Sequence, residues 1–362
     1  MIPFAAGAPE DRHREHRREE APSIGCGNCL HDVRAYWLAD PDMTHVYAFN
    51  GDADGLCALQ QLRLVDPLEA TLVTGVKRDI ELLRRVNAAA GDDVTVLDIS
   101  LDANRDELLR LLNAGAAVRY FDHHYAGELP KHPNLEAHIE ESPDVCTSTL
   151  VDRHLAGRHR PWAIVAAFGD NLKNLAVAMA KAAGIDAATA ATLERLGICL
   201  NYNAYGNTLS DLCFDPQDLA RQMLPFADPM EFVRGSPAFV HLGARFDEDM
   251  QRARTLEPAR KVPGATVVVL PDEAWSRRAI GVLANELTEA QPDCAIAIVS
   301  PKAQGGFAVS VRVPPCHPVA ADEFCRTFAT GGGRRLAAGI NHLPATDLDR
   351  FAASFEARFR TR

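Results

Sequence analysis

Acidic residues and histidines follow several apolar segments of this 362-residue sequence. The clearest case is Asp122-His123-His124, which comes directly after the apolar residues 116–121, a predicted buried strand. A carboxylate and two imidazoles are costly to bury unless they bind something, and divalent metal ions bind such groups. A single Asp-His-His sequence also occurs by chance. The metal-site interpretation therefore requires further ligands at the ends of neighbouring strands.

Two aspartates follow the predicted strand at residues 44–49. Asp52 and Asp54 stand two positions apart, between Gly51 and Gly55, and a helical segment begins behind them. Two carboxylates on such a turn can each face a metal ion, and the glycines permit a tight bend. The alternatives are a calcium-type loop and a simple turn capped by Asp. An EF-hand is excluded, because no further acidic ligands follow at the required offsets.

Strands and helices alternate along the first half of the chain. The pattern predicts further strands at residues 70–75 and 94–97, the second of which is followed by Asp98. Parallel strands of this kind end at one edge of a sheet. We therefore expect five side chains to converge there: Asp52, Asp54, Asp98, Asp122 and His123.

Later segments are less specific. Asp170 follows the apolar residues 163–168 and by itself is typical of a helix N-cap. A helix is expected over residues 76–86, where Lys77 and Arg78 either form a solvated helix start or face a substrate anion. Residues 142–149 are expected to begin a helix, residues 172–261 to form helices, and residues 199–206 to form a loop.

The composition is that of a soluble globular protein large enough for two domains, with 47% hydrophobic and 24% charged residues. No apolar run approaches the roughly 20 residues of a membrane span, and residues 1–22 lack the apolar core of an export signal. We therefore expect a cytoplasmic protein with reduced cysteines. Cys26, Cys29 and His31 are either half of a zinc site or, as we favour, a plain loop. The net charge of −11 favours a short anionic substrate over a long polymer.

Four motifs together resemble those of the DHH phosphoesterase superfamily, in that family's order, between residues 44 and 170. They are Asp52-Ala53-Asp54-Gly55, Leu97-Asp98, Asp122-His123-His124 and Gly169-Asp170-Asn171. The C-terminal third resembles the family's associated substrate-binding domain. Its glycine-rich motif matches residues 331–339, and its lesser landmarks match residues 276–281 and 310–312.

The resemblance implies an α/β fold. A parallel-sheet N-terminal DHH domain is joined by a helical connector to a smaller C-terminal α/β domain, which faces it across a cleft. The boundaries expected from the sequence are a peripheral segment at 1–41, the DHH domain at 42–195, the connector at 196–262 and the associated domain at 263–362.

The resemblance also implies a site with two Mn²⁺ or Mg²⁺ ions. Asp98 would bridge the ions and Asp52 would bind one of them, while Asp54, His123 and Asp170 would bind the other. Asp122 would be a ligand or would orient His123, and His124 would contact the scissile phosphate. Substrate would be bound by Arg312, Gly331, Gly332, Gly333 and Arg334, with the three glycines expected to precede a helix.

Three positions depart from the family pattern. Ala48 stands where many members have a histidine, Asn50 where RecJ-type members often have an acid, and Arg334 where the glycine motif often carries histidine. The first metal is therefore expected to be bound less tightly. Arginine can still grip phosphate but cannot transfer a proton near neutral pH.

The function implied by the resemblance is metal-dependent hydrolysis of phosphodiester bonds in short oligonucleotides or small nucleotide phosphates, without a membrane partner. Whether the protein is a homodimer is left open. Alternatives are a RecJ-type single-strand exonuclease, a phosphatase or pyrophosphatase, and a nucleotide-binding regulator with an impaired site.

Overall fold

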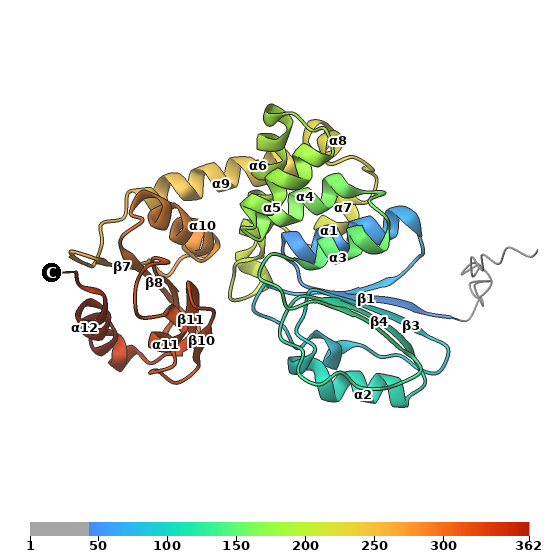
Figure 1. The fold of residues 1–362 in the computed structure, drawn as a ribbon, viewed down its shortest axis with the longest axis horizontal. Coiled ribbons are helices and arrows are strands. Elements are labelled where there is room, and N and C mark those ends of the chain that lie inside the picture. The colour runs from blue at the N-terminus through green and yellow to red at the C-terminus, as the bar shows by residue number, and fades with distance from the viewer. Residues whose placement is uncertain (1–42, 362) are drawn as a thin grey trace, which may run out of the picture. The chain divides into compact units, whose positions relative to one another are not determined.

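The structure is a computed structural model and describes residues 43–361. The predicted peripheral segment at 1–41, with Cys26, Cys29 and His31, lies outside the described residues. Two sheets and the helices between and around them make up the described chain (Figure 1).

The first sheet has five parallel strands in the order β2-β1-β3-β4-β5. The strands are β1 (His45–Phe49), β2 (Thr71–Val73), β3 (Asp93–Leu97), β4 (Ala117–Asp122) and β5 (Leu135–Ile139). Alternate residues of β1 face opposite cores, because successive strand side chains point to opposite faces. Tyr47 and Phe49 lie in one core, whereas Val46 and Ala48 lie in the other.

Helices cover both faces of this sheet (Figure 1). One face packs against α1 (Ala53–Val65), α3 (Thr147–His154) and α4 (Arg160–Gly169), and the other against α2 (Arg105–Asn113) and the 3₁₀ turns η2 (Leu82–Arg85) and η3 (Asp102–Asn104). The doubly covered parallel sheet confirms the predicted α/β fold. The prediction of a helix over residues 76–86 is wrong, because this segment forms a turn followed by the short 3₁₀ helix η2.

A series of helices follows the first sheet, as the sequence predicts for residues 172–261. They are α5 (Lys173–Ala182), α6 (Ala187–Ala204), η4 (Leu209–Asp211), α7 (Pro216–Met223), α8 (Pro229–Gly235) and α9 (Pro237–Arg254). The loop expected at residues 199–206 is mostly wrong, because α6 continues to Ala204 and buries Cys199, Leu200 and Tyr202.

The second sheet is mixed, with the order β10-β11-β9-β8-β7-β6. Only β7 and β8 are parallel neighbours among its described strands. Its elements are β6 (Arg260–Val262), β7 (Ala265–Val269), α10 (Ala274–Ala290), β8 (Ala295–Pro301), β9 (Phe307–Arg312), α11 (Ala321–Cys325), β10 (Gly331–Gly333), β11 (Ala337–Leu343), η5 (Ala345–Asp347) and α12 (Leu348–Phe359).

The two faces of β8 belong to different cores. Ile296 and Ile298 lie in the core that also contains α10 and the helices of the first sheet, whereas Ala297 and Val299 lie with α11 and α12. Helix α10 packs against α9 and α6. None of the helices in residues 43–361 has the length and apolar character needed to span a membrane.

Candidate metal centre

The register of the first sheet aligns the ends of three strands. Phe49 of β1 pairs with Leu97 of β3, which pairs with Phe121 of β4. The residues that follow these positions therefore leave the sheet at one level. This edge receives Asp52, Asp98 and the Asp122-His123-His124 sequence, as the alternating pattern predicts.

Asp52 is the N-cap of α1. Its Oδ1 accepts hydrogen bonds from the backbone N–H groups of Asp54 and Gly55, at 3.0 and 3.1 Å. Gly55 is needed for this tight start, since a Cβ there would lie 2.1 Å from the carbonyl oxygen of Asn50. The capped-turn alternative is thus also true, because Asp52 caps α1 and lies in the acidic site.

Asp54 connects α1 to the start of α3. Its two carboxylate oxygens accept hydrogen bonds from the backbone N–H groups of Thr147 and Ser148, each at 2.7 Å. The serine hydroxyl also donates to the backbone carbonyl of Asp54, at 2.8 Å. The hydroxyl-rich segment at residues 142–149 therefore begins a helix as expected, and α3 fixes a carboxylate that is 1% exposed.

Asp98 lies in the middle of the acidic residues in a left-handed backbone conformation, with φ of 60°. Its N–H donates to the carbonyl of Phe121 at 3.0 Å, which ties the end of β3 to the end of β4. Burial, followed by the charges of Asp52 and Asp54, raises the pKa of Asp98 well above its ordinary value. A bound cation would offset this repulsion.

His123 presents one ring nitrogen to the carboxylates. Nδ1 contacts the carbonyl of Val145 at 2.8 Å, so that Nδ1 carries the proton in the neutral ring. Nε2 lies 3.5 Å from Asp98 Oδ1 and 3.9 Å from Asp170 Oδ2. This is the arrangement of a metal-binding histidine, with one nitrogen fixed by the backbone and the other free to bind.

Asp170 reaches the same place from another helix. It is the C-cap of α4, and the N-cap interpretation is therefore wrong. Gly169 lets α4 approach closely, because a Cβ there would lie 2.4 Å from Ala53 Cβ and 2.8 Å from the carbonyl of Gly197. Ligand atoms of Asp54, His123 and Asp170 all lie within 4.8 Å of one another.

Asp122 contacts His124, whereas the resemblance allowed a role in orienting His123. Asp122 Oδ1 is 2.7 Å from His124 Nδ1, and its Oδ2 is buried with no hydrogen-bond partner among the described residues. The His124 side chain is 40% exposed. Asp122 therefore holds a partly exposed imidazole at the rim of the acidic site.

Lys77 belongs to the site although its sequence context left its role open. Its ammonium forms an ion pair with Asp52 Oδ2 and lies 4.0 Å from Asp170 Oδ1. It also donates to Asn201 Oδ1 at 3.1 Å. Of the two alternatives for Lys77, the structure excludes a solvated helix start. Asn201, in the segment expected to be a loop, was missed.

The charges of the site are unbalanced. Four buried or half-buried aspartates, with Asp122 beside them, face the positive charge of Lys77. Burial lowers the pKa of His123, but Asp98 outweighs burial and the pKa rises to about 10. Without a metal the ring therefore carries a second proton, which a bound ion would displace. The site therefore attracts cations, and a divalent ion fits its donor set of carboxylates with one free imidazole nitrogen. The buried Asp122 Oδ2, without a partner in the described chain, agrees with a cation nearby.

The predicted substrate residues lie in the second sheet. Arg312 ends β9 and donates to Ser310 Oγ at 3.0 Å, while the three glycines form β10. The helix expected after the glycines is wrong, since β10 and β11 form an antiparallel hairpin that contains Arg334. Gly331 packs on α11, where a Cβ would lie 1.8 Å from the carbonyl of Cys325. Among residues 43–361, no hydrogen bond or ion pair joins Arg312 or Arg334 to the acidic site.

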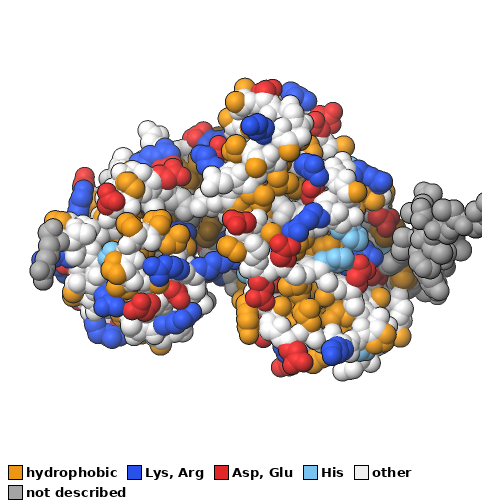
Figure 2. Space-filling view, in the orientation of Figure 1, with side chains coloured by type: hydrophobic (Ala, Val, Ile, Leu, Met, Phe, Trp, Pro, Cys, Tyr) orange, Lys and Arg blue, Asp and Glu red, His pale blue; other side chains and the backbone are white. Residues whose placement is uncertain are grey.

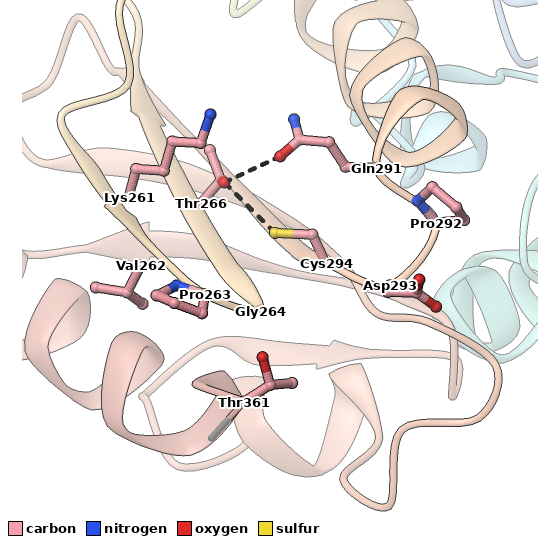
Figure 3. A pocket seen from close by; sticks show the side chains of 10 residues that line it. All are labelled: Lys261, Val262, Pro263, Gly264, Thr266, Gln291, Pro292, Asp293, Cys294 and Thr361. Carbon is pink, nitrogen blue, oxygen red and sulfur yellow. Dashed lines mark hydrogen bonds between the residues drawn. The ribbon is translucent and has the colours of Figure 1, made fainter.

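The pocket in Figure 3, of about 540 Å³, is a poor alternative site. It lies where β7 and β8 begin, and Thr266 is 3.4 Å from both Gln291 Oε1 and Cys294 Sγ. Ligands of α/β sheets bind at the opposite, carboxyl ends of strands.

The face in Figure 2 carries interspersed acidic and basic side chains, and the net charge of the chain is −11.

Comparison with known proteins identifies the fold. No family model and no curated protein matches the sequence. The structure matches exonuclease RecJ bound to manganese over 87% of this chain and 89% of that chain, with a TM-score of 0.54 and 20% identity. It matches the DHH domain of a member of a ribosomal protein family over 88% of each chain, with a TM-score of 0.59 and 12% identity. The chain has the DHH-domain fold.

A third matching structure is the pGpG-specific phosphodiesterase PggH from Vibrio cholerae. It matches over 87% of this chain and 98% of that chain, with a TM-score of 0.53 and 13% identity. At these identities the similarity establishes the fold, and it confirms the fold that the sequence motifs imply.

Proposed function

We propose that this protein is a divalent-metal-dependent phosphoesterase that hydrolyses short oligonucleotides or small nucleotide phosphates. The observation that carries the proposal is the position of His123 Nε2, which is the free nitrogen of a buried ring and lies 3.5 Å from Asp98 and 3.9 Å from Asp170. Carboxylates gathered around one imidazole nitrogen form a donor set that suits a divalent cation. The fold shared with manganese-bound RecJ and with PggH supports the same proposal.

The metal would be held by Asp54, Asp98, His123 and Asp170. When bound, a divalent ion supplies a Lewis acid for the phosphoryl oxygens and lowers the pKa of an attacking water. The protein contributes the orientation of its ligands. Val145 fixes the ring of His123, and the α3 N–H groups fix Asp54.

We assign to His124 the contact with the phosphate. Asp122 holds its Nδ1, so Nε2 is the nitrogen left for a substrate. Its 40% exposure gives access from solvent. Arg78 lines a small recess with Lys77 and Tyr205, and we assign to it the capture of a further anionic group. Arg312, Arg334 and the glycines of β10 stay candidates for substrate binding by resemblance.

Short substrates are favoured over long single strands. The net charge is −11, and the face in Figure 2 has no extended area of basic side chains among the described residues. A single-strand-binding groove needs such an area. The match to nearly the whole of the pGpG-specific PggH chain agrees with a small substrate.

Hydrolysis of a substrate panel tests the proposal. The protein is freed of metal with a chelator and assayed with Mn²⁺, with Mg²⁺ and with neither. The panel contains a dinucleotide, a long single strand, a cyclic dinucleotide, a bisphosphorylated nucleoside and pyrophosphate. We expect metal-dependent hydrolysis, fastest on the dinucleotide. Preference for the long strand would favour the RecJ-type alternative. Nucleotide binding without turnover on any substrate would contradict the proposal and favour the regulator.

A further inference from the structure

We infer that the site holds one divalent ion, and that the ammonium of Lys77 occupies the place of the second ion that the family resemblance implies. The inference rests on the proposed function, because it concerns how the same site neutralises the negative charge of a phosphate substrate. It differs from the family pattern in the number of metals and in the role of Asp52.

Both oxygens of Asp52 already have partners. Oδ1 accepts two backbone hydrogen bonds from the first turn of α1, and Oδ2 is paired with Lys77. The pair is buried on the carboxylate side, where Asp52 is 2% exposed. The carboxylate is therefore already neutralised by a protein cation.

Lys77 is held at both ends. Its backbone N–H donates to the carbonyl of Ala204 at 2.9 Å, and its carbonyl accepts from Asn50 Nδ2 at 3.4 Å. Its ammonium donates to Asn201 and lies 5.6 Å from the ring centre of Tyr205. A lysine fixed in this way has little freedom to move aside for an ion, because its partners come from α6, from the N-cap of α1 and from the end of β1 together.

The metal-ligand atoms other than those of Asp52 define one ion position. Two groups of metal-ligand atoms occur at this edge among residues 43–361, one with Asp98, His123 and His124 and one with Asp54, His123 and Asp170. Both contain His123, whose single free nitrogen can bind one ion. Asp52 belongs to neither of these two groups of described residues.

The sequence around Asp52 agrees with this. Ala48, where many family members have histidine, is buried in β1 and offers no ligand. Asn50 stands where RecJ-type members often have an acid. Its amide nitrogen donates to the carbonyl of Lys77, and its buried Oδ1 has no partner among the described residues. At these two positions a second ion would therefore find one neutral amide oxygen, and neither a histidine nor an acid.

Metal stoichiometry tests the inference without any substrate. Metal-free protein is titrated with Mn²⁺ and followed by calorimetry and by the electron paramagnetic resonance of bound Mn²⁺. We expect one ion per wild-type chain with the signal of an isolated ion. Lys77→Ala should bind two ions, with the altered signal of a coupled pair. Arg78→Ala removes a neighbouring positive charge and should still bind one.

Asp52→Asn gives a second, independent arm that does not depend on Lys77→Ala folding. We expect it to bind one ion, like the wild type, because Asp52 is not a metal ligand. Two ions in the wild type, falling to one in Asp52→Asn, would overturn the inference. The inference would also be overturned if the wild type and Lys77→Ala each bound one Mn²⁺ ion per chain. If one ion is bound and no panel substrate is hydrolysed, the proposed function fails while this inference stands.

Discussion

His124 differs from the other described residues of the acidic edge because its side chain is substantially exposed. Its Nδ1 is held 2.7 Å from Asp122 Oδ1, and 40% of its side chain faces solvent. His123, by contrast, is 4% exposed and turns its Nε2 inward. Two adjacent histidines thus have separate proposed roles, one toward the metal and one toward the substrate.

His124→Ala should lower kcat by about 10²–10³-fold, the range for loss of one hydrogen-bond donor to a transition-state oxygen. Mn²⁺ affinity should change little, since His123 and the aspartates remain. Steady-state kinetics and Mn²⁺ calorimetry measure both. Asp122→Asn is the matched variant and should give a smaller loss of kcat with the same affinity. A loss of metal binding in His124→Ala would show that His124 is a ligand.

The sequence predicts that acidic residues meet at one edge of the sheet, because their signal is local. Asp52, Asp98 and Asp122 each follow an apolar strand, and parallel strands end at one edge. Lys77 could not be assigned in this way, since its partner Asp52 is 25 residues away and Asn201 is 124 residues away. Only the fold brings them together. Asp170 was misread as an N-cap because a helix end and a helix start look alike in an apolar stretch.

At the scale of elements, two glycines of β10 differ in their surroundings, one packed against a neighbouring element and one open. A Cβ at Gly331 would lie 1.8 Å from the carbonyl of Cys325, whereas a Cβ at Gly332 would meet nothing within 4 Å in the described chain. Gly331 therefore lets β10 lie against α11. Gly332 has no packing reason to be glycine, and its open position suits the approach of a substrate.

Gly331→Ala should lower the free energy of unfolding by roughly 1–3 kcal/mol, as expected for overpacking. Gly332→Ala should leave stability unchanged and raise KM for the preferred substrate. Urea unfolding and steady-state kinetics compare the two variants. An unchanged KM in Gly332→Ala would remove this glycine from the substrate site.

The junction of η4 with α10 makes stability depend on pH. Asp211 Oδ1 pairs with Arg277 at 2.7 Å, and Oδ2 accepts from the N–H groups of Asn207 and Thr208. Burial raises the pKa of Asp211, but Arg277 and these N–H groups outweigh burial and lower it. As the pH falls, the Asp211 carboxylate is therefore protonated at a higher pH in the unfolded chain than in the folded chain. The stabilisation is complete above the unfolded pKa of about 3.9 and is lost as pH falls through the lower folded value.

Asp211→Asn should be less stable than wild type near neutral pH, and the difference should shrink below about pH 4. Urea unfolding at a series of pH values measures it. A difference that stays constant down to acid pH would show that the charge of Asp211 contributes nothing.

Elements without a local signal were predicted less well than the sheet. The helix expected over residues 76–86 is a turn with a short 3₁₀ segment, because Lys77 and its neighbours are held by contacts to α6 and to Asp52. The glycine run was expected before a helix but forms an edge strand, because β11 offers it hydrogen bonds. In both cases a distant partner decides the local structure.

At the scale of the whole described chain, one buried network ties the C-terminal sheet to the helices before it. Arg278 of α10 donates to Asp249 Oδ2 of α9 at 2.7 and 2.9 Å and to the Tyr202 hydroxyl of α6 at 2.8 Å. Tyr202 and Asp249 are fully buried and Arg278 is nearly so. Removing one member of such a network leaves a buried charge without its partner.

Asp249→Ala should lower the free energy of unfolding by about 3–5 kcal/mol. The exposed pair of Arg254 and Glu286 joins the same two helices, at 2.6 Å. Glu286→Ala is thus a matched control and should cost about 0–1 kcal/mol. Chemical unfolding of both variants measures the contrast. An equal loss of unfolding free energy in the two variants would show that burial does not strengthen the α9–α10 contact.

Asp98→Asn tests the central claim most directly. Asparagine has the same shape and tolerates the left-handed φ of 60°, so the fold should be retained. Mn²⁺-dependent hydrolysis of a dinucleotide is measured for wild type and variant side by side, with circular dichroism as the check of folding. We predict hydrolysis by the wild type that requires Mn²⁺ and is lost in Asp98→Asn. Equal hydrolysis by both proteins, or hydrolysis independent of metal, would contradict a metal-dependent phosphoesterase centred on Asp98.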